Sequence, residues 1–210
     1  MERATTRFEA FSDGVFAFAI TLLVLDLAVP GSRGDSQGAL AASLRGHWPA
    51  FLSFALSFLT ILILWMNHHA LFDWVVRPTG QLMVANGVLL LLVVLVPFTT
   101  AVLGDHLGGP AGRLAAATYT GLLVLVAVAF VWIWRIVTRG RAALAPRLPD
   151  EEVRLTNRYL AFGFAAQSGA FLLAWWSAVA SVALTMVLAL FWLGNAYRRH
   201  RAPPVAGGGA

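Results

Sequence analysis

The chain has 210 residues, of which 59% are hydrophobic and 12% are charged, and its formal net charge is +5. A soluble domain is about half apolar and about a quarter charged, so this chain has too little polar surface for a water-soluble globule and must face lipid. With no cysteine, disulfides, thiolate metal sites and a cysteine nucleophile are excluded.

The first apolar segment covers about residues 8–29 and stops at a Pro-Gly-Ser sequence. A membrane span needs roughly 20 mainly apolar residues, so this segment is long enough. It contains three acidic residues, Glu9, Asp13 and Asp26, and no convincing cleavage site follows it. We therefore expect a retained helix rather than a signal peptide.

Five further apolar segments are long enough to span a bilayer: about 48–72, 82–103, 114–137, 155–175 and 177–197. The last two are joined only by Trp175-Trp176-Ser177, without the glycine or proline that usually marks a bend. The sequence thus predicts an all-α integral membrane protein with six transmembrane helices. Residues 1–197 form one six-helix subunit, and residues 198–210 form a basic, then Pro/Gly-rich, cytoplasmic tail.

All 15 basic residues are arginines, and their distribution predicts the orientation. With six spans, twelve arginines lie on the side of the two termini and three, Arg33, Arg45 and Arg113, lie on the other. Positive residues accumulate on the cytoplasmic side of membrane proteins, so both termini are expected in the cytoplasm. Because the arginines form no single patch, nucleic acid is not expected as a partner.

Asp13 lies about a turn and a half inside the first span, where a charge costs at least about 2.5–3.5 kcal/mol near the helix centre. Trp65, Asn67, His68 and His69 lie at the cytoplasmic end of the second span and offer partners. We expect a contact between Asp13 and a histidine, which would act as a clip between helices, as a gating element, or as both. Asn86, Gln167 and Asn195 are expected to form hydrogen bonds between helices.

No catalytic set, phosphate-binding loop or carbonyl selectivity filter occurs in the sequence. His47 and His106 fall on the opposite side from His68 and His69, so neither a zinc site nor haem ligation is supported. We expect no enzymatic activity, no cofactor and no resident metal ion.

Three motifs resemble those of the bacterial members of the transmembrane protein 175 potassium channels. They are Arg7-x-x-x-Phe11-Ser12-Asp13 with the apolar residues that follow it, Trp65-x-Asn67-His68-His69-x-Leu71-Phe72, and Pro97-Phe98-x-Thr100-x-x-Leu103. Together they cover about the first half of the chain. The second half agrees with the family in hydropathy and span count only.

The resemblance implies a multi-pass protein of the cell membrane, a homotetramer whose first helix lines a potassium pore among membrane lipids. It places a hydrophobic constriction at Phe18, Leu22 and Leu25, with Thr21 as a neighbouring polar layer. It also implies that a network holds the pore helix and influences opening, formed by Arg7, Phe11, Ser12, Asp13, Trp65, Asn67, His68 and His69. The family usually has isoleucine or leucine where this chain has Phe18.

Helical geometry is consistent with separate positions for the constriction residues and the network residues on the first helix. At about 100° per residue, Leu22 and Leu25 lie within about 40° of Phe18, whereas Asp13 lies about 140° away. The apolar stripe and the polar motif are therefore expected on different faces of the first helix.

The leading hypothesis is a passive, potassium-favouring cation channel. A proton-coupled secondary transporter that uses Asp13 and a histidine as its relay is the alternative, although transporters tend to have internal repeats and interrupted helices, and neither is evident in the sequence. A non-conducting membrane scaffold is the third possibility.

Overall fold

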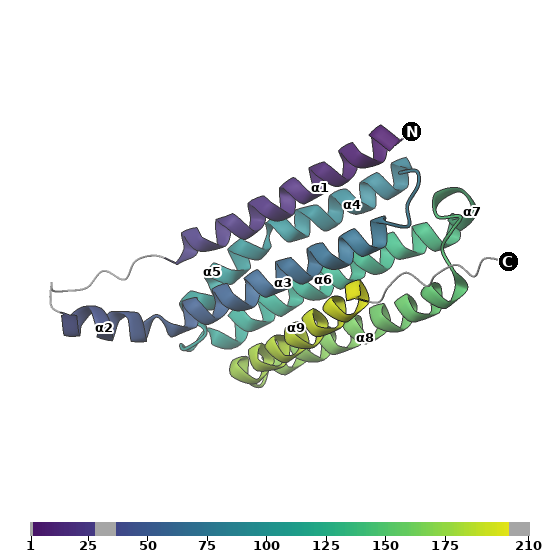
Figure 1. Ribbon diagram of the computed structural model, residues 1–210. Helices are drawn as coiled ribbons and strands as arrows, with labels where there is room; N and C mark the ends of the chain where they lie inside the picture. Colours follow the sequence, from purple (N-terminus) through teal and green to yellow (C-terminus); the bar gives the residue numbers. More distant parts are fainter. Residues whose placement is uncertain (1, 28–36, 202–210) are drawn as a thin grey trace.

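The computed structural model describes the backbone of residues 2–27 and 37–201, and the side chains of residues 6–25, 27 and 37–194. Within these ranges every regular element is a helix (Figure 1). This confirms the all-α prediction. The Pro-Gly-Ser stop after the first segment and most of the predicted tail lie outside the described residues.

The long helices coincide closely with the predicted segments. They are α1 (Glu2–Leu22), α3 (Trp48–Phe72), α4 (Gly80–Val94), α5 (Val96–His106), α6 (Gly112–Arg139), α8 (Asp150–Ala174) and α9 (Ala178–Arg201). Three short elements were not predicted: the 3-10 helix η1 (Leu23–Asp26), α2 (Gln37–Gly46) and α7 (Arg141–Leu144). Figure 1 shows α2 extending away from the bundle, and none of its residues is buried.

Four stretches of the described chain are long and apolar enough to cross a membrane: Thr6–Leu25, Trp48–Phe72, Gly80–His106 and Gly112–Arg139. Ala178–Gly194 is apolar but shorter. Helix α8 is long but more polar, because its first turn is acidic and Arg154 and Arg158 follow. The structure therefore supports a multi-span membrane protein, and the count of six spans stays a prediction.

The third predicted span is not one continuous helix, because α4 and α5 meet at Leu95. Proline has no backbone N–H, and its ring displaces the preceding turn of a helix, so Pro97 in the first turn of α5 accounts for the break. The hydrogen bonds continue across it, from Leu95 N to Leu91 O at 3.3 Å and from Thr99 N to Leu95 O at 3.2 Å. The interruption is a bend rather than an unwound segment.

The hairpin between α8 and α9 forms at the predicted place. Ser177 replaces the missing glycine or proline, since its Oγ accepts a hydrogen bond from Ala180 N at 3.2 Å, the role of a helix N-cap. Ser181 of α9 then donates to Ala170 O of α8 at 2.7 Å. Asp150, Glu151 and Glu152 occupy the first turn of α8, where the helix dipole favours carboxylates.

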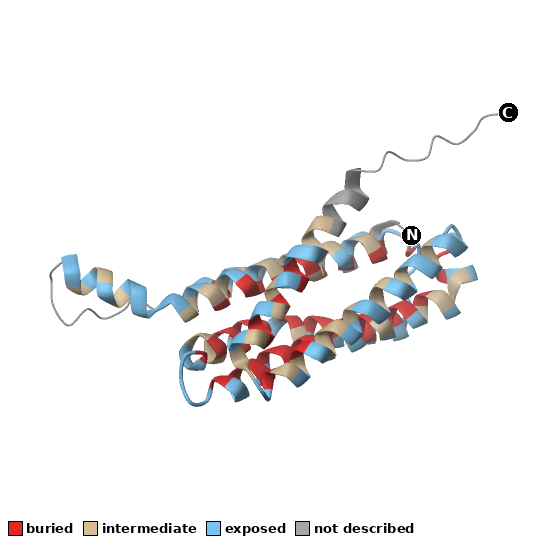
Figure 2. Ribbon diagram, turned by 90° about the horizontal axis from the view of Figure 1, so that it is seen from below, coloured by how far each residue is buried: buried red, intermediate tan, exposed pale blue. Residues whose placement is uncertain are grey.

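Helix α6 is the central element, and it packs against α4, α5, α8 and α9. Buried residues concentrate where helices face one another (Figure 2). Helix α1 packs on α3, α4 and α5 and lies at the edge of the bundle (Figure 1). One side of α1 is therefore held by the rest of the chain and the other side is not.

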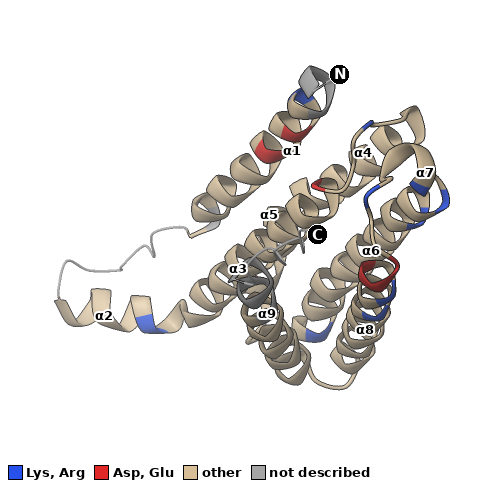
Figure 3. Cartoon of the chain, turned by 45° about the vertical axis from the view of Figure 1, so that its right-hand side comes forward, with Lys and Arg blue, Asp and Glu red and all other residues tan. Residues whose placement is uncertain are grey.

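The basic residues gather at the end of the bundle that carries α7, called here the α7 end (Figure 3). Arg141 of α7 forms an ion pair with Asp150 of α8, and this guanidinium holds the pKa of the Asp150 carboxyl below its usual range. Arg45 lies on α2 and Arg113 at the start of α6, away from this end. Which side of the membrane the α7 end faces stays a prediction.

Candidate functional site

Helix α1 has one tightly packed face and one open face. Phe16 is 1% exposed and Leu23 is fully buried, whereas Phe11, Phe18 and Leu25 are 66%, 61% and 72% exposed. Large apolar side chains this open need a cover, either lipid or another protein surface. The open face is therefore the part of α1 that is available for a function outside the single chain.

The structure refines where the predicted constriction residues lie. Phe18, Thr21 and Leu25 are all exposed on the open face, while Leu22 is half-buried at its edge. Leu25 belongs to η1 rather than to the α-helix, so the angle expected from uniform α-helical geometry does not apply to it. A 3-10 turn has about 3.0 residues, which places Leu25 nearly above Leu22, one turn further along.

The packed face of α1 is held by a chain of hydrogen bonds that crosses three helices. His68 Nε2 of α3 donates to Asn86 Oδ1 of α4 at 2.8 Å, and Asn86 Nδ2 donates to Ser12 Oγ of α1 at 3.0 Å. Ser12 Oγ in turn donates to Phe8 O at 3.1 Å. The amide oxygen of Asn86 can only accept, so the hydrogen of the His68–Asn86 bond is on Nε2 of His68.

The His68 side chain is enclosed as well as hydrogen-bonded. It is 1% exposed, it stacks on Phe72 with ring centroids 4.3 Å apart, and Phe16 of α1 lies 5.3 Å away. Ser12 and Asn86 are buried to the same degree, at 0% and 1% exposure. A polar chain this enclosed fixes the position of α1 against α3 and α4, since each group would lose its partner if α1 moved.

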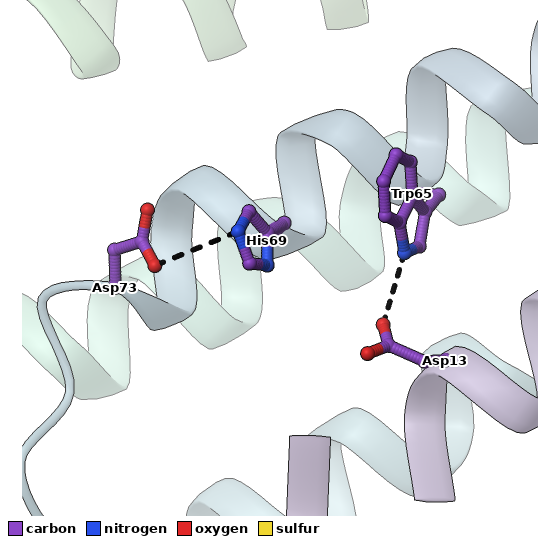
Figure 4. Close-up of polar contacts among 4 residues, drawn as sticks. All are labelled: Asp13, Trp65, His69 and Asp73. Atoms are coloured by element: carbon purple, nitrogen blue, oxygen red, sulfur yellow. Dashed lines mark hydrogen bonds and ion pairs between the residues drawn. The ribbon is translucent and has the colours of Figure 1, made fainter. Parts of the chain in front are cut away.

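Asp13 has a different partner from the one expected. Trp65 Nε1 donates to Asp13 Oδ1 at 2.9 Å (Figure 4), and no hydrogen bond between described residues joins Asp13 to a histidine. His69 instead lies 3.8 Å from Asp73, one turn along its own helix. The expected Asp13–histidine contact was wrong because His68 faces α4, while Trp65 is the α3 residue whose N–H reaches α1.

Four residues of the predicted network do not join it, and His69 is one of them because it pairs with Asp73. Arg7 and Phe11 are exposed, and Phe11 lies on the open face of α1 in line with Phe18. Asn67 lines a cavity on a side of α3 that also faces α6 and α8. The structure therefore brings together Ser12, Asp13, Trp65 and His68, with Asn86 as the link that the sequence indicated only as an interhelical partner.

A second buried polar cluster was not found from the sequence. Thr100 of α5 donates to Ser57 Oγ of α3 at 2.6 Å, and Ser57 donates to Tyr119 Oη of α6 at 3.1 Å. All three residues are at most 3% exposed. Hydroxyl side chains in apolar helices often bond to their own backbone, as Thr60 does to Leu56 O, so a cluster shared between helices could not be predicted from the sequence.

The described residues contain no group of three or more histidine, aspartate or glutamate side chains that could hold a metal ion. Ser12 and Asp13 of α1 are each hydrogen-bonded to a side chain of another helix, Ser12 to Asn86 and Asp13 to Trp65. Such an arrangement positions a helix. Its open face carries apolar side chains and Thr21.

Residues 7–97 match the model of a protein family that is described as the endosomal/lysosomal potassium channel TMEM175. A potassium channel of Chamaesiphon minutus is 40% identical over 187 residues, which cover 89% of this chain and 92% of that protein. The chain belongs to the TMEM175 family. The matched residues 7–97 contain α1, α3 and α4, and thus the whole Ser12–Asn86–His68 chain and the Asp13–Trp65 pair.

A solved TMEM175 structure extends the agreement to the fold. The crystal structure of a lysosomal potassium-selective channel TMEM175 homolog from Chamaesiphon minutus has a TM-score of 0.84 and 38% identity, covering 92% of this chain and 98% of that one. The endosomal/lysosomal proton channel TMEM175 of Bos taurus is 32% identical over 168 residues, which cover 76% of this chain and 34% of the bovine protein. Proteins of this family are thus named for two different ions.

Proposed function

We propose that this TMEM175 protein is a passive, potassium-favouring cation channel of the cell membrane. Four copies assemble around a central axis, each with six transmembrane helices and both termini in the cytoplasm. The open face of α1 from each copy lines the pore. Its side chains Phe18, Leu22 and Leu25 form a hydrophobic constriction in place of a carbonyl filter.

The observation that carries this proposal is the exposure of apolar side chains along one line of an edge helix whose opposite face is fixed. A helix that only met lipid would need no buried hydrogen-bond chain to set its rotation. Here Ser12 and Asp13 hold α1 in one orientation, and that orientation directs Phe18 and Leu25 outward. The potassium-channel names of bacterial relatives support the same function.

A hydrophobic constriction selects among ions by how easily each ion loses part of its water shell. An ion in a narrow apolar neck loses part of its water shell, and such necks close by dewetting. Potassium holds its shell less tightly than sodium, so partial dehydration favours potassium. Phe18 makes the neck narrower than an aliphatic residue would, while the ring faces attract a cation electrostatically, and the Thr21 hydroxyl supplies oxygen at the next level.

The anchoring contacts then bear on opening. Widening the neck requires α1 to move against α3 and α4, which strains the Asp13–Trp65 bond and the chain through Asn86. These contacts favour one position of α1, so weakening them should change the fraction of time that the channel conducts.

The absence of cysteine makes a direct test possible. Single cysteines are placed at Phe18, at Thr21 and, as a lipid-facing control, at Leu172 of α8, which is 57% exposed. We expect oxidation to cross-link Phe18→Cys subunits, and a cationic methanethiosulfonate reagent to block potassium flux through Thr21→Cys liposomes. Leu172→Cys should show neither effect. The pore assignment is wrong if Thr21→Cys and Leu172→Cys respond alike in folded, assembled protein.

Conductance should be ohmic in a potassium gradient, with no saturation by a small substrate and no need for a pH gradient. The alternative, a proton-coupled transporter with an Asp13 relay, predicts the reverse.

The bend at Leu95 weakens the sequence argument against a transporter, because an interrupted helix is present after all. Backbone hydrogen bonds nevertheless run from Leu95 to Leu91 and from Thr99 to Leu95, so the helix is bent there rather than unwound. Proton flux measured alongside potassium flux separates the two ions after which the family is named.

A further inference from the structure

A cavity of about 200 Å³ lies between α3, α6, α8 and α9, on the side of α3 away from α1. It takes no part in the proposed pore or in the anchoring contacts. Cavities of about 150 Å³ with apolar walls stay dry and bind small apolar molecules. This cavity is larger, and its walls are mostly aliphatic and aromatic, including Ile63, Val126, Phe130, Leu160 and Phe164.

The cavity is elongated along the helices. On α8 its lining runs from Glu152, in the first turn at the α7 end, to Gln167, about 22 Å further along the helix axis. A volume of about 200 Å³ spread over that length leaves a narrow channel. A linear chain fits this shape better than a compact ring system.

The end at Gln167 has one unused hydrogen-bond donor. The side-chain amide nitrogen of Gln167 is buried and has no partner among the described residues. A buried donor left unpaired costs about 1–3 kcal/mol, so the position calls for an explanation. The sequence led us to expect that Gln167 bonds to another helix, and this expectation was wrong for its amide nitrogen.

An acceptor lies at the same end. Thr185 of α9 lines the cavity, and its hydroxyl proton is already donated to Ser181 O at 2.9 Å. The lone pairs of Thr185 Oγ1 therefore face a ligand as acceptors, beside the donor of Gln167. A hydroxyl group can satisfy both, because it accepts one hydrogen bond and donates another.

The walls also select against charge. Among the described side chains that line the cavity, only Glu152 is charged, and it lies at the far end from Gln167. A carboxylate ligand would meet no cation there, and burying an unpaired charge is strongly unfavourable. We propose that this cavity binds an uncharged, linear medium-chain alkanol, with its hydroxyl between Gln167 and Thr185 and its chain running toward Glu152.

Photolabelling tests the site without reference to conduction. The purified full-length protein is irradiated with an octanol that carries a diazirine, and the labelled residues are mapped by mass spectrometry. We expect labels on α8 and α9 residues that line the cavity and are not exposed, such as Leu160 and Leu188. Excess 1-octanol should displace them, whereas octane and octanoate should compete at least about fivefold less well, the factor that one neutral hydrogen bond of about 1 kcal/mol provides.

Three variants distinguish binding of octanol in the cavity from its non-specific partitioning into lipid or detergent. Ala127→Phe fills the cavity from α6, and Ala165→Phe adds the same ring on the exposed side of α8 as a control. Gln167→Leu keeps the volume and removes the donor, so it should abolish the preference for octanol over octane. Ala127→Phe should lose the label and Ala165→Phe should keep it.

Labels confined to exposed residues such as Leu172 and Val187, or equal labelling of the two phenylalanine variants, would overturn the proposal. So would a label that a phosphatidylcholine displaces at concentrations where octanol does not, since the occupant would then be a lipid tail. An unchanged octanol preference in folded Gln167→Leu would also contradict it.

Discussion

Replacing Asn86 by leucine tests whether the buried polar chain holds α1 in place. Leucine has the branched shape of asparagine with a somewhat larger volume, so the site stays filled while two hydrogen bonds are lost, to Ser12 at 3.0 Å and to His68 at 2.8 Å. Hydrogen bonds between membrane helices contribute about 0.6 kcal/mol on average and up to about 1.7 kcal/mol each. The His68 N–H is also left buried without a partner, which adds about 1–3 kcal/mol. We expect the free energy of unfolding to fall by about 2–4 kcal/mol.

The measurement is reversible unfolding in mixed micelles titrated with dodecyl sulfate, followed by fluorescence of the eight tryptophans. Gln81→Leu on the exposed side of the same helix is the matched control and should change the free energy of unfolding by less than about 0.5 kcal/mol. A double-mutant cycle of Ser12→Ala with Asn86→Leu should give a coupling of about 0.6–1.7 kcal/mol. Zero coupling, or an Asn86→Leu effect no larger than that of Gln81→Leu, would refute the reasoning.

Two further substitutions test neighbouring contacts. Trp65→Phe keeps a ring but removes the donor to Asp13, so we expect a loss of roughly 1.5–3 kcal/mol of stability, as for a hydrogen bond to a charged group, together with altered potassium flux in liposomes. Trp176→Phe, at a residue that is 72% exposed, should change neither quantity. Tyr119→Phe removes the acceptor of Ser57 and should lower the free energy of unfolding by about 0.6–1.7 kcal/mol, against little change for the exposed Thr118→Val. If Tyr119→Phe matches Thr118→Val, the second cluster contributes nothing to stability.

Sequence patterns located the helices well because lipid imposes a strict length and apolarity on a span. The segment 48–72 was predicted with the bounds that α3 has, and the tight turn before α9 was placed correctly. The bend at Leu95 was missed although Pro97 was visible, since apolar neighbours on both sides let the hydropathy pattern run through it. Helix α2 lies outside the bundle with no buried residue, so it has no long apolar segment from which it could be predicted.

The site was predicted in part. The separation of an apolar stripe from a polar face on α1 follows from helical periodicity, and Ser12, Asp13, Trp65 and His68 do meet. The hydrogen-bond partners within that group could not be predicted from the sequence, because adjacent residues such as His68 and His69 point about 100° apart on a helix. Only the rotation of α3 decides that His68 faces α4 and that Trp65 reaches Asp13.

By itself, the sequence determined that this protein is a bundle of membrane helices of the TMEM175 type, because hydrophobic length and local motifs are properties of single segments. Tertiary structure alone decided which donor meets which acceptor, which side of α1 stays open, and that the amide nitrogen of Gln167 lies unpaired beside a cavity. Those features depend on the rotation and spacing of helices far apart in the chain. Packing sets these quantities, and no single segment encodes them.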